Sequence, residues 1–124
     1  MILLLWTIAM LAVHLRSRQL VKRMWEPGQN RLAWLTVNSL VRFEGLYYIA
    51  AVIYAVMERR AALFVPIAVL AVIHFAVWAA VERRSDWPAA TSERKQLLDR
   101  IQIFDWGESL VLVYIAWWLV EALH

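Results

Sequence analysis

Long apolar stretches dominate this chain of 124 residues and leave few folds open to it. Apolar side chains make up 63% of the residues, whereas soluble domains contain about 45–50%. A single domain of this length has too small an interior to bury so much apolar surface, so lipid must solvate most of it. Because unpaired backbone polar groups are costly in lipid, residues 1–124 are predicted to form one all-α, polytopic membrane domain.

Four stretches approach the roughly 20 apolar residues that a helix needs to cross a bilayer. The predicted transmembrane helices are Ile2–Leu15, Leu32–Met57, Ala61–Val81 and Ile101–Leu123. The first is short by itself, and the link of residues 58–60 is short enough to make the second and third an antiparallel hairpin. The predicted breaks in the chain are the turn at Pro27–Asn30, the loop at Trp87-Pro88 and a helix start at the membrane surface near Ser92–Lys95.

Basic residues are unevenly distributed among the loops, which predicts the orientation. The middle link carries only Arg59 and Arg60. The first long loop and its flanks carry Arg16, Arg18, Lys22, Arg23 and Arg31. The second long loop and its flanks carry Arg83, Arg84, Arg94, Lys95 and Arg100. Loops 16–31 and 82–100 are therefore expected to be cytoplasmic and both termini outside. This pattern is typical of a bacterial-type inner membrane.

The two halves of the chain match at an offset of about sixty residues. The matched segments are Ile8–Val13 with Ile67–Val72, Lys22-Arg23 with Arg83-Arg84, Pro27 with Pro88, Asn38 with Asp99, and Phe43-Glu44 with Phe104-Asp105. Two tandem helical-hairpin repeats, about 1–60 and 61–124, would share one orientation and be related by an axis along the membrane normal. The alternative is convergence of two hairpins under the same lipid constraints.

Polar residues interrupt the second and fourth apolar stretches. They are Asn38, Arg42 and Glu44 in the second, and Gln102, Asp105, Glu108 and Ser109 in the fourth. Ionisable groups inside a membrane usually face a bundle interior or a water-filled cavity, and they mark candidate functional sites. We expect the three carboxylates to bind a cation or protons, with Arg42 as their counter-charge.

Two other interpretations of these polar residues stay open. They can form interhelical hydrogen bonds and ion pairs that only hold the helices together. They can also lie at the headgroup level, although the apolar stretches that would then be left, 46–57 and 110–120, are short for an ordinary span.

Histidines offer a second candidate site. His14 and His74 lie at nearly the same depth on helices expected to run in the same direction. Two facing imidazoles can ligate a b-type haem or a metal ion, but a single membrane histidine is more often hydrogen-bonded to a neighbour. No cofactor is therefore expected, with haem b as a minor alternative.

Function can be bounded but not named from these features. Cysteine is absent, which excludes disulfides and thiolate ligands, and no HExxH, GxSxG or phosphate-loop motif occurs, so an enzyme is the less favoured class. The net charge of +3 is explained by topology, so nucleic acid is not an expected partner. The leading hypothesis is ion or proton translocation, by a homo-oligomer or within a larger complex. A non-catalytic accessory subunit comes second, and a haem-bearing electron carrier third.

Overall fold

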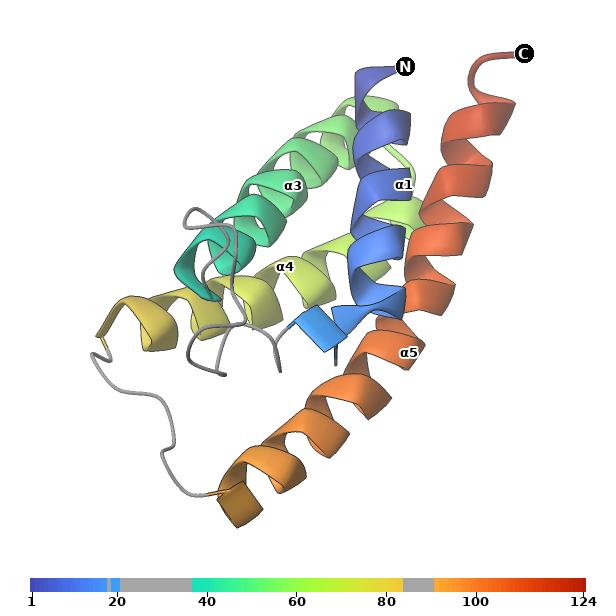
Figure 1. Ribbon diagram of the computed structural model, residues 1–124. Helices are drawn as coiled ribbons and strands as arrows, with labels where there is room; N and C mark the ends of the chain where they lie inside the picture. Colours follow the sequence, from blue (N-terminus) through green and yellow to red (C-terminus); the bar gives the residue numbers. More distant parts are fainter. Residues whose placement is uncertain (18, 21–36, 84–90) are drawn as a thin grey trace.

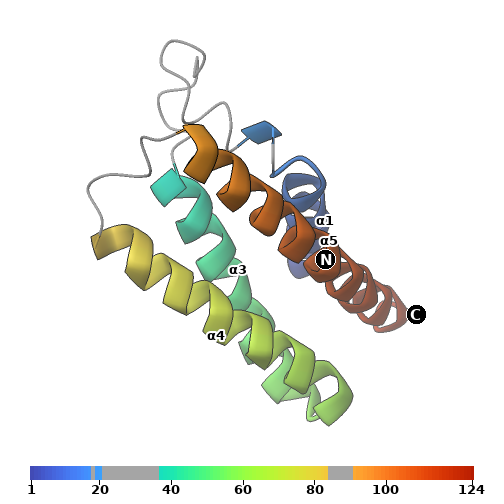
Figure 2. The ribbon, with the colours of Figure 1, turned by 90° about the horizontal axis from the view of Figure 1, so that it is seen from below.

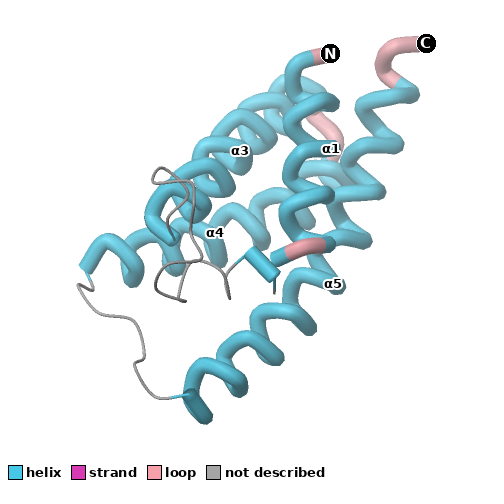
Figure 3. Tube along the Cα trace, in the orientation of Figure 1, coloured by secondary structure: helices cyan, strands magenta, loops and turns pink. Residues whose placement is uncertain are grey.

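The computed structural model describes residues 1–17, 19–20, 37–83 and 91–124. This part of the chain contains four α-helices and no strand, which confirms the all-α prediction for it (Figures 1 and 3). The helices are α1 (Ile2–Leu15), α3 (Val37–Glu58), α4 (Ala61–Arg83) and α5 (Thr91–Glu121). Both termini lie at the same end of the bundle as the α3–α4 link, called here the terminus end (Figure 1). The opposite end is called the loop end.

Three of the four helices are long and apolar enough to cross a membrane. Their candidate spans are Ser39–Glu58, Ala61–Ala80 and Lys95–Glu121. Helix α1 is apolar but has only 14 residues, or about 21 Å at 1.5 Å per residue, against a hydrocarbon core of about 30 Å. Four spans were predicted, and three are supported by helix length.

The fourth span begins earlier than expected. The segment expected between the third and fourth spans, 82–100, is helical at both ends, because α4 continues to Arg83 and α5 begins at Thr91. The expected helix start near Ser92 is confirmed. The predicted turn at Pro27–Asn30 and the loop at Trp87-Pro88 lie outside the described residues.

The helices associate as two closely packed pairs. Helix α3 packs along α4 and α1 along α5, whereas α1 meets α3, and α4 meets α5, at fewer positions (Figures 1 and 2). The α3–α4 pair is the hairpin predicted from its short link. Arg59 makes the tight reversal in the left-handed region, with a φ of 53°, which ends α3 as such residues commonly end helices.

Apolar side chains fill the bundle on the terminus side and cover its outside. The buried cluster includes Met10, Tyr47, Ala51, Ala55, Leu63, Ile67, Leu112 and Ile115. The outward faces expose large apolar side chains such as Ile53, Val69, Ile103 and Leu110. An apolar surface of this extent is suited to lipid rather than water.

Two glycines next to the polar residues have different surroundings. A Cβ atom at Gly45 would collide with the indole ring of Trp78 on α4, whereas one at Gly107 would meet nothing within 4 Å. Gly45 therefore allows α3 and α4 to approach closely at this level.

We expect Gly45→Ala to destabilise the fold by about 1–3 kcal/mol, because the Trp78 ring must move. The matched change Gly107→Ala should be neutral or stabilise by up to about 1 kcal/mol, through higher helix propensity. Unfolding in mixed detergent micelles measures both. Equal effects of the two changes would contradict the close α3–α4 contact.

Candidate functional site

Two buried histidines face each other across the bundle. His14 on α1 and His74 on α4 have ring centroids 6.3 Å apart. Each ring places Nδ1 against the carbonyl oxygen one helical turn earlier, at 2.7 Å to Met10 and 2.8 Å to Leu70. A carbonyl only accepts hydrogen bonds, so both Nδ1 atoms carry the proton. Both Nε2 atoms are thereby turned toward the interior.

The carboxylate of Glu108 on α5 lies between the two imidazoles. Its Oε2 is 2.8 Å from Nε2 of His14 and its Oε1 is 3.2 Å from Nε2 of His74. The Glu108 side chain is 0% exposed and that of His14 is 1% exposed. Glu108 is therefore the central group of the cluster.

Glu44 on α3 lies near the same two imidazoles. Its Oε1 lies 3.8 Å from Nε2 of His14, and its Oε2 lies 3.8 Å from Nε2 of His74. His14, Glu44, His74 and Glu108 thus come one from each helix, and we call them the four-helix site. The structure brings together the candidate histidine pair and the candidate carboxylates, which the sequence had suggested as separate sites.

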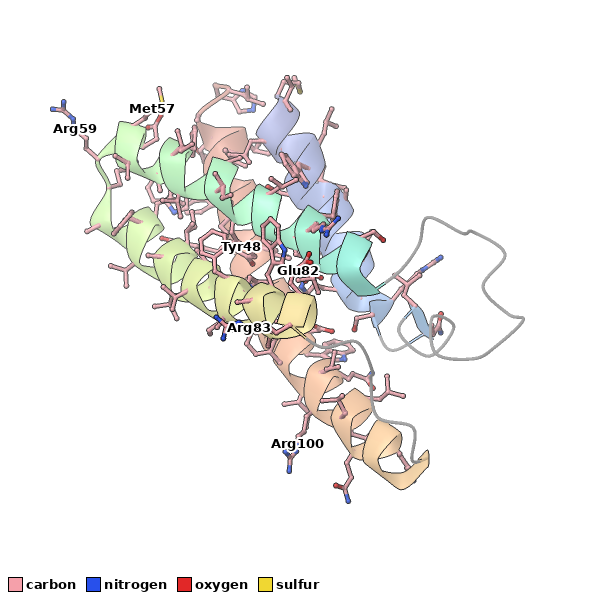
Figure 4. The ribbon with its side chains drawn as sticks, turned by 90° about the vertical axis from the view of Figure 1, so that its left-hand side faces the viewer. Tyr48, Met57, Arg59, Glu82, Arg83 and Arg100 are labelled. Carbon is pink, nitrogen blue, oxygen red and sulfur yellow. The ribbon has the colours of Figure 1, made fainter. Side chains whose placement is uncertain are left out.

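Two further polar side chains contact the four-helix site. The hydroxyl of Tyr48 donates a hydrogen bond to Oε1 of Glu108, and the Tyr48 ring lies over His74 with centroids 4.5 Å apart. Figure 4 shows Tyr48 inside the bundle. Asp105 places Oδ1 3.7 Å from Nε2 of His14 and is hydrogen-bonded to Ser17. A third carboxylate therefore borders the site.

Arg42 does not supply the counter-charge that was expected of it. Its Nε donates to Oε1 of Glu82 on α4 at 2.7 Å, and its side chain is 55% exposed. Trp78 Nε1 donates to the same oxygen at 3.1 Å. These two donors hold the pKa of Glu82 below its ordinary value. The Arg42–Glu82 pair thus joins α3 to α4 at the loop end, where Figure 4 shows Glu82.

The positive charge of the four-helix site must therefore come from protons or a bound cation. Glu44, Asp105 and Glu108 carry three negative charges when ionised, and two neutral imidazoles compensate none of them. An uncompensated charge is very costly to bury. A group of this composition is suited to taking up cationic species.

The depth of the site differs between the helices. At 1.5 Å per residue, its members are about 18 to 21 Å along their helices from the terminus end, counted from Ile2, Glu58, Ala61 and Glu121. From the loop-end limits of the described spans, Ser39, Ala80 and Lys95, the distances to Glu44, His74 and Glu108 are about 8, 9 and 20 Å. The site is thus near the loop end on α3 and α4 and midway along the α5 span.

Ser109, Gln102 and Asn38 are the remaining predicted site residues. The Ser109 hydroxyl donates to the backbone oxygen of Asp105 at 2.7 Å, within its own helix. Gln102 lies partly buried on α5, three residues before Asp105. The side chain of Asn38 lies outside the described part of the structure.

Sequence reasoning underused two signals. His14, Glu44, His74 and Glu108 lie at similar distances from the terminus ends of their helices, so depth counted from that end would have grouped them. Tyr48 was not among the predicted site residues, yet it contacts both Glu108 and His74. Thr7 was missed; its hydroxyl lies 2.9 Å from that of the buried Tyr47.

Removing the Tyr48 hydroxyl should weaken the fold by about 1.5–3 kcal/mol, because a buried carboxylate loses a donor. The matched change is Tyr114→Phe, which removes a 3.3 Å hydrogen bond to the Ala62 carbonyl at the terminus end. That change should cost no more than about 1 kcal/mol. Detergent unfolding of Tyr48→Phe and Tyr114→Phe compares them. A cost for Tyr48→Phe no larger than for Tyr114→Phe would contradict its placement at Glu108.

Comparisons with known proteins do not indicate a function for this site. No protein-family model, no curated protein and no solved structure matches the chain. Function is therefore derived from the residues that meet at Glu108 and from their position in the bundle.

Proposed function

We propose that this chain is a small integral membrane protein that binds a cation at the four-helix site and passes it across the membrane. One observation carries the proposal: each of the four described helices contributes an imidazole or a carboxylate to one buried site, in which both imidazoles contact Glu108 and lie 3.8 Å from Glu44. Intramembrane clusters of this kind mark ion and proton pathways. A set that only held the helices together would not need three carboxylates around two imidazoles.

The cation would reach the site from the cytoplasm. The excess of Lys and Arg near the loop end favours a cytoplasmic location for that end, with both termini outside. On α3 and α4 the site lies about 8 to 9 Å from the described limit of the span at that end, which supports loading from the cytoplasmic side.

Passage to the other side requires the helices to move. Between the site and the terminus end lie buried apolar side chains, among them Ala51, Ile67, Leu112 and Ile115. Beyond them a cavity of about 520 Å³ opens at the terminus end, lined by Tyr54, Glu58, Arg60, Leu63, Trp117, Trp118, Glu121 and Ala122. This cavity would receive the cation once the apolar layer opens.

Helix pairing supports the further proposal that the two halves are repeats. An axis that exchanges α1 with α4 and α3 with α5 would map the α1–α5 pair onto α4–α3, and these are the two closely packed pairs. It would also exchange His14 with His74, whose Nδ1 atoms bond in the same way. Glu108 has Tyr47 at its repeat position, so a single central carboxylate would serve both histidines.

Flux into liposomes tests the proposal. Purified protein should carry protons or divalent cations into vesicles loaded with a pH or metal indicator. Glu108→Gln should lower the rate at least about tenfold, the effect of losing about 1.4 kcal/mol of cation affinity. Gln96→Ala, a change at an exposed polar side chain near the beginning of α5, should leave the rate within about twofold.

Two controls make the flux result decisive. Arg42→Gln and Ser109→Ala should retain flux, because Arg42 pairs with Glu82 and Ser109 with its own helix. Wild-type vesicles no more permeable than empty ones, or a Glu108→Gln variant as active as wild type, would contradict translocation.

An accessory subunit of a larger membrane complex is the second candidate. The layer of buried apolar side chains between the site and the terminus end favours it, because such a layer is expected of helices that only support a larger assembly. The mass of the particle extracted in mild detergent separates the two. A stoichiometric complex with larger proteins favours the subunit, and this chain alone or a homo-oligomer favours translocation. A haem-bearing carrier is favoured less, because Glu108 lies where the iron would bind.

A further inference from the structure

We propose that the four-helix site binds a divalent first-row transition-metal ion, with His14, His74 and Glu108 as ligands and Glu44 as the fourth. The inference rests on the proposed function in one respect, since it names the class of cation that would be carried. As a metal site it is tested separately from transport.

Histidine orientation is the first argument. Metal-bound histidines commonly donate their other ring N–H to a carbonyl or carboxylate, which fixes the tautomer and aims the free nitrogen at the metal. His14 and His74 both do this, through Met10 and Leu70. Two histidines on different helices therefore present Nε2 lone pairs to the same small volume.

An unpartnered close contact is the second argument. Nε2 of His14 lies 2.8 Å from Oε2 of Glu108, yet among the described residues neither atom has a hydrogen-bond partner. Both atoms are buried. An unprotonated ring nitrogen and a carboxylate oxygen repel each other at this distance unless a cation lies beside them, and two ligands of one metal ion lie side by side in this way.

Spacing is the third argument. One ligand atom from each of His14, His74 and Glu108 can be chosen so that all lie within 4.8 Å of one another. Metal–ligand bonds of about 2.0–2.2 Å place two ligands of one ion between about 2.8 Å and 4.4 Å apart. The Nε2–carboxylate distances in the site, 2.8 Å, 3.2 Å and 3.8 Å, lie within this range. Glu44, 3.8 Å from both Nε2 atoms, completes four ligands.

The donor set and its charge select the class of ion. Imidazole nitrogen suits zinc, iron, nickel and copper, whereas calcium and magnesium prefer oxygen ligands alone. A dication compensates Glu44 and Glu108 and leaves only the bordering Asp105 to be neutralised by a proton, and a neutral group costs least to bury in an apolar bundle. An alkali-metal ion in the same place would leave a net negative charge.

The test is metal binding by the whole chain, purified in mild detergent and stripped with a chelator. Titration with Zn²⁺ should give one ion per chain, and Co²⁺ should give the visible bands of a nitrogen–oxygen site. His14→Gln and His74→Gln should each weaken Zn²⁺ binding at least about 100-fold. The reason is that removing a ligand lowers metal affinity more than removing a group that only hydrogen-bonds a ligand. His124→Gln, at the exposed third histidine, should change it less than about twofold.

Several outcomes would overturn the inference. They are no Zn²⁺ or Co²⁺ binding by the wild-type chain, binding that survives both histidine changes, or equal affinity for Mg²⁺. If a variant fails to fold, as judged by its circular dichroism, the Co²⁺ spectrum of the wild type still decides whether imidazole ligates the metal.

Transport and metal binding can fail independently. Proton flux that depends on Glu108, without metal binding, would leave the proposed function standing and overturn the metal site. Metal bound at these residues without any flux would support the metal site and overturn translocation.

Discussion

The requirement that the buried carboxylate of Glu108 be compensated governs much of this structure. Both imidazoles contact it, at 2.8 Å and 3.2 Å, and Tyr48 donates a hydrogen bond to it. Because these partners come from α1, α4 and α3, the central carboxylate ties together helices that are distant in sequence. A membrane supplies no hydrophobic force between helices, so polar contacts of this kind weigh heavily in their association.

The bundle has different contacts on the two sides of the site. On the terminus side, residues such as Ala51, Ile67, Leu112 and Ile115 are buried in one apolar cluster, and this layer can seal the membrane. On the loop side, the Arg42–Glu82 pair and the contact of Gly45 with Trp78 hold α3 against α4. A cation at Glu108 would therefore be separated from the terminus end by a layer of buried apolar side chains.

Much of the fold could be predicted from the sequence, but the composition of the site could not. Apolar length predicted the helices, and the short link predicted the α3–α4 hairpin. The site needed three-dimensional information because depth along a helix gives a level and not a facing direction: Arg42 is close to Glu44 in sequence, yet its long side chain reaches Glu82 on α4. His14 and Glu108 are far apart in sequence, and only the close α1–α5 pairing brings them together.

Solid-state NMR of the chain in bilayers, labelled with ¹³C and ¹⁵N at histidine and glutamate, tests the central claim most directly. The claim is that His14, Glu44, His74 and Glu108 meet at one intramembrane site. We predict protonated Nδ1 atoms on both buried imidazoles and through-space contacts from both rings to the Glu108 carboxyl carbon. The absence of those contacts, or rings that exchange rapidly with water and lack the Nδ1 proton, would contradict it.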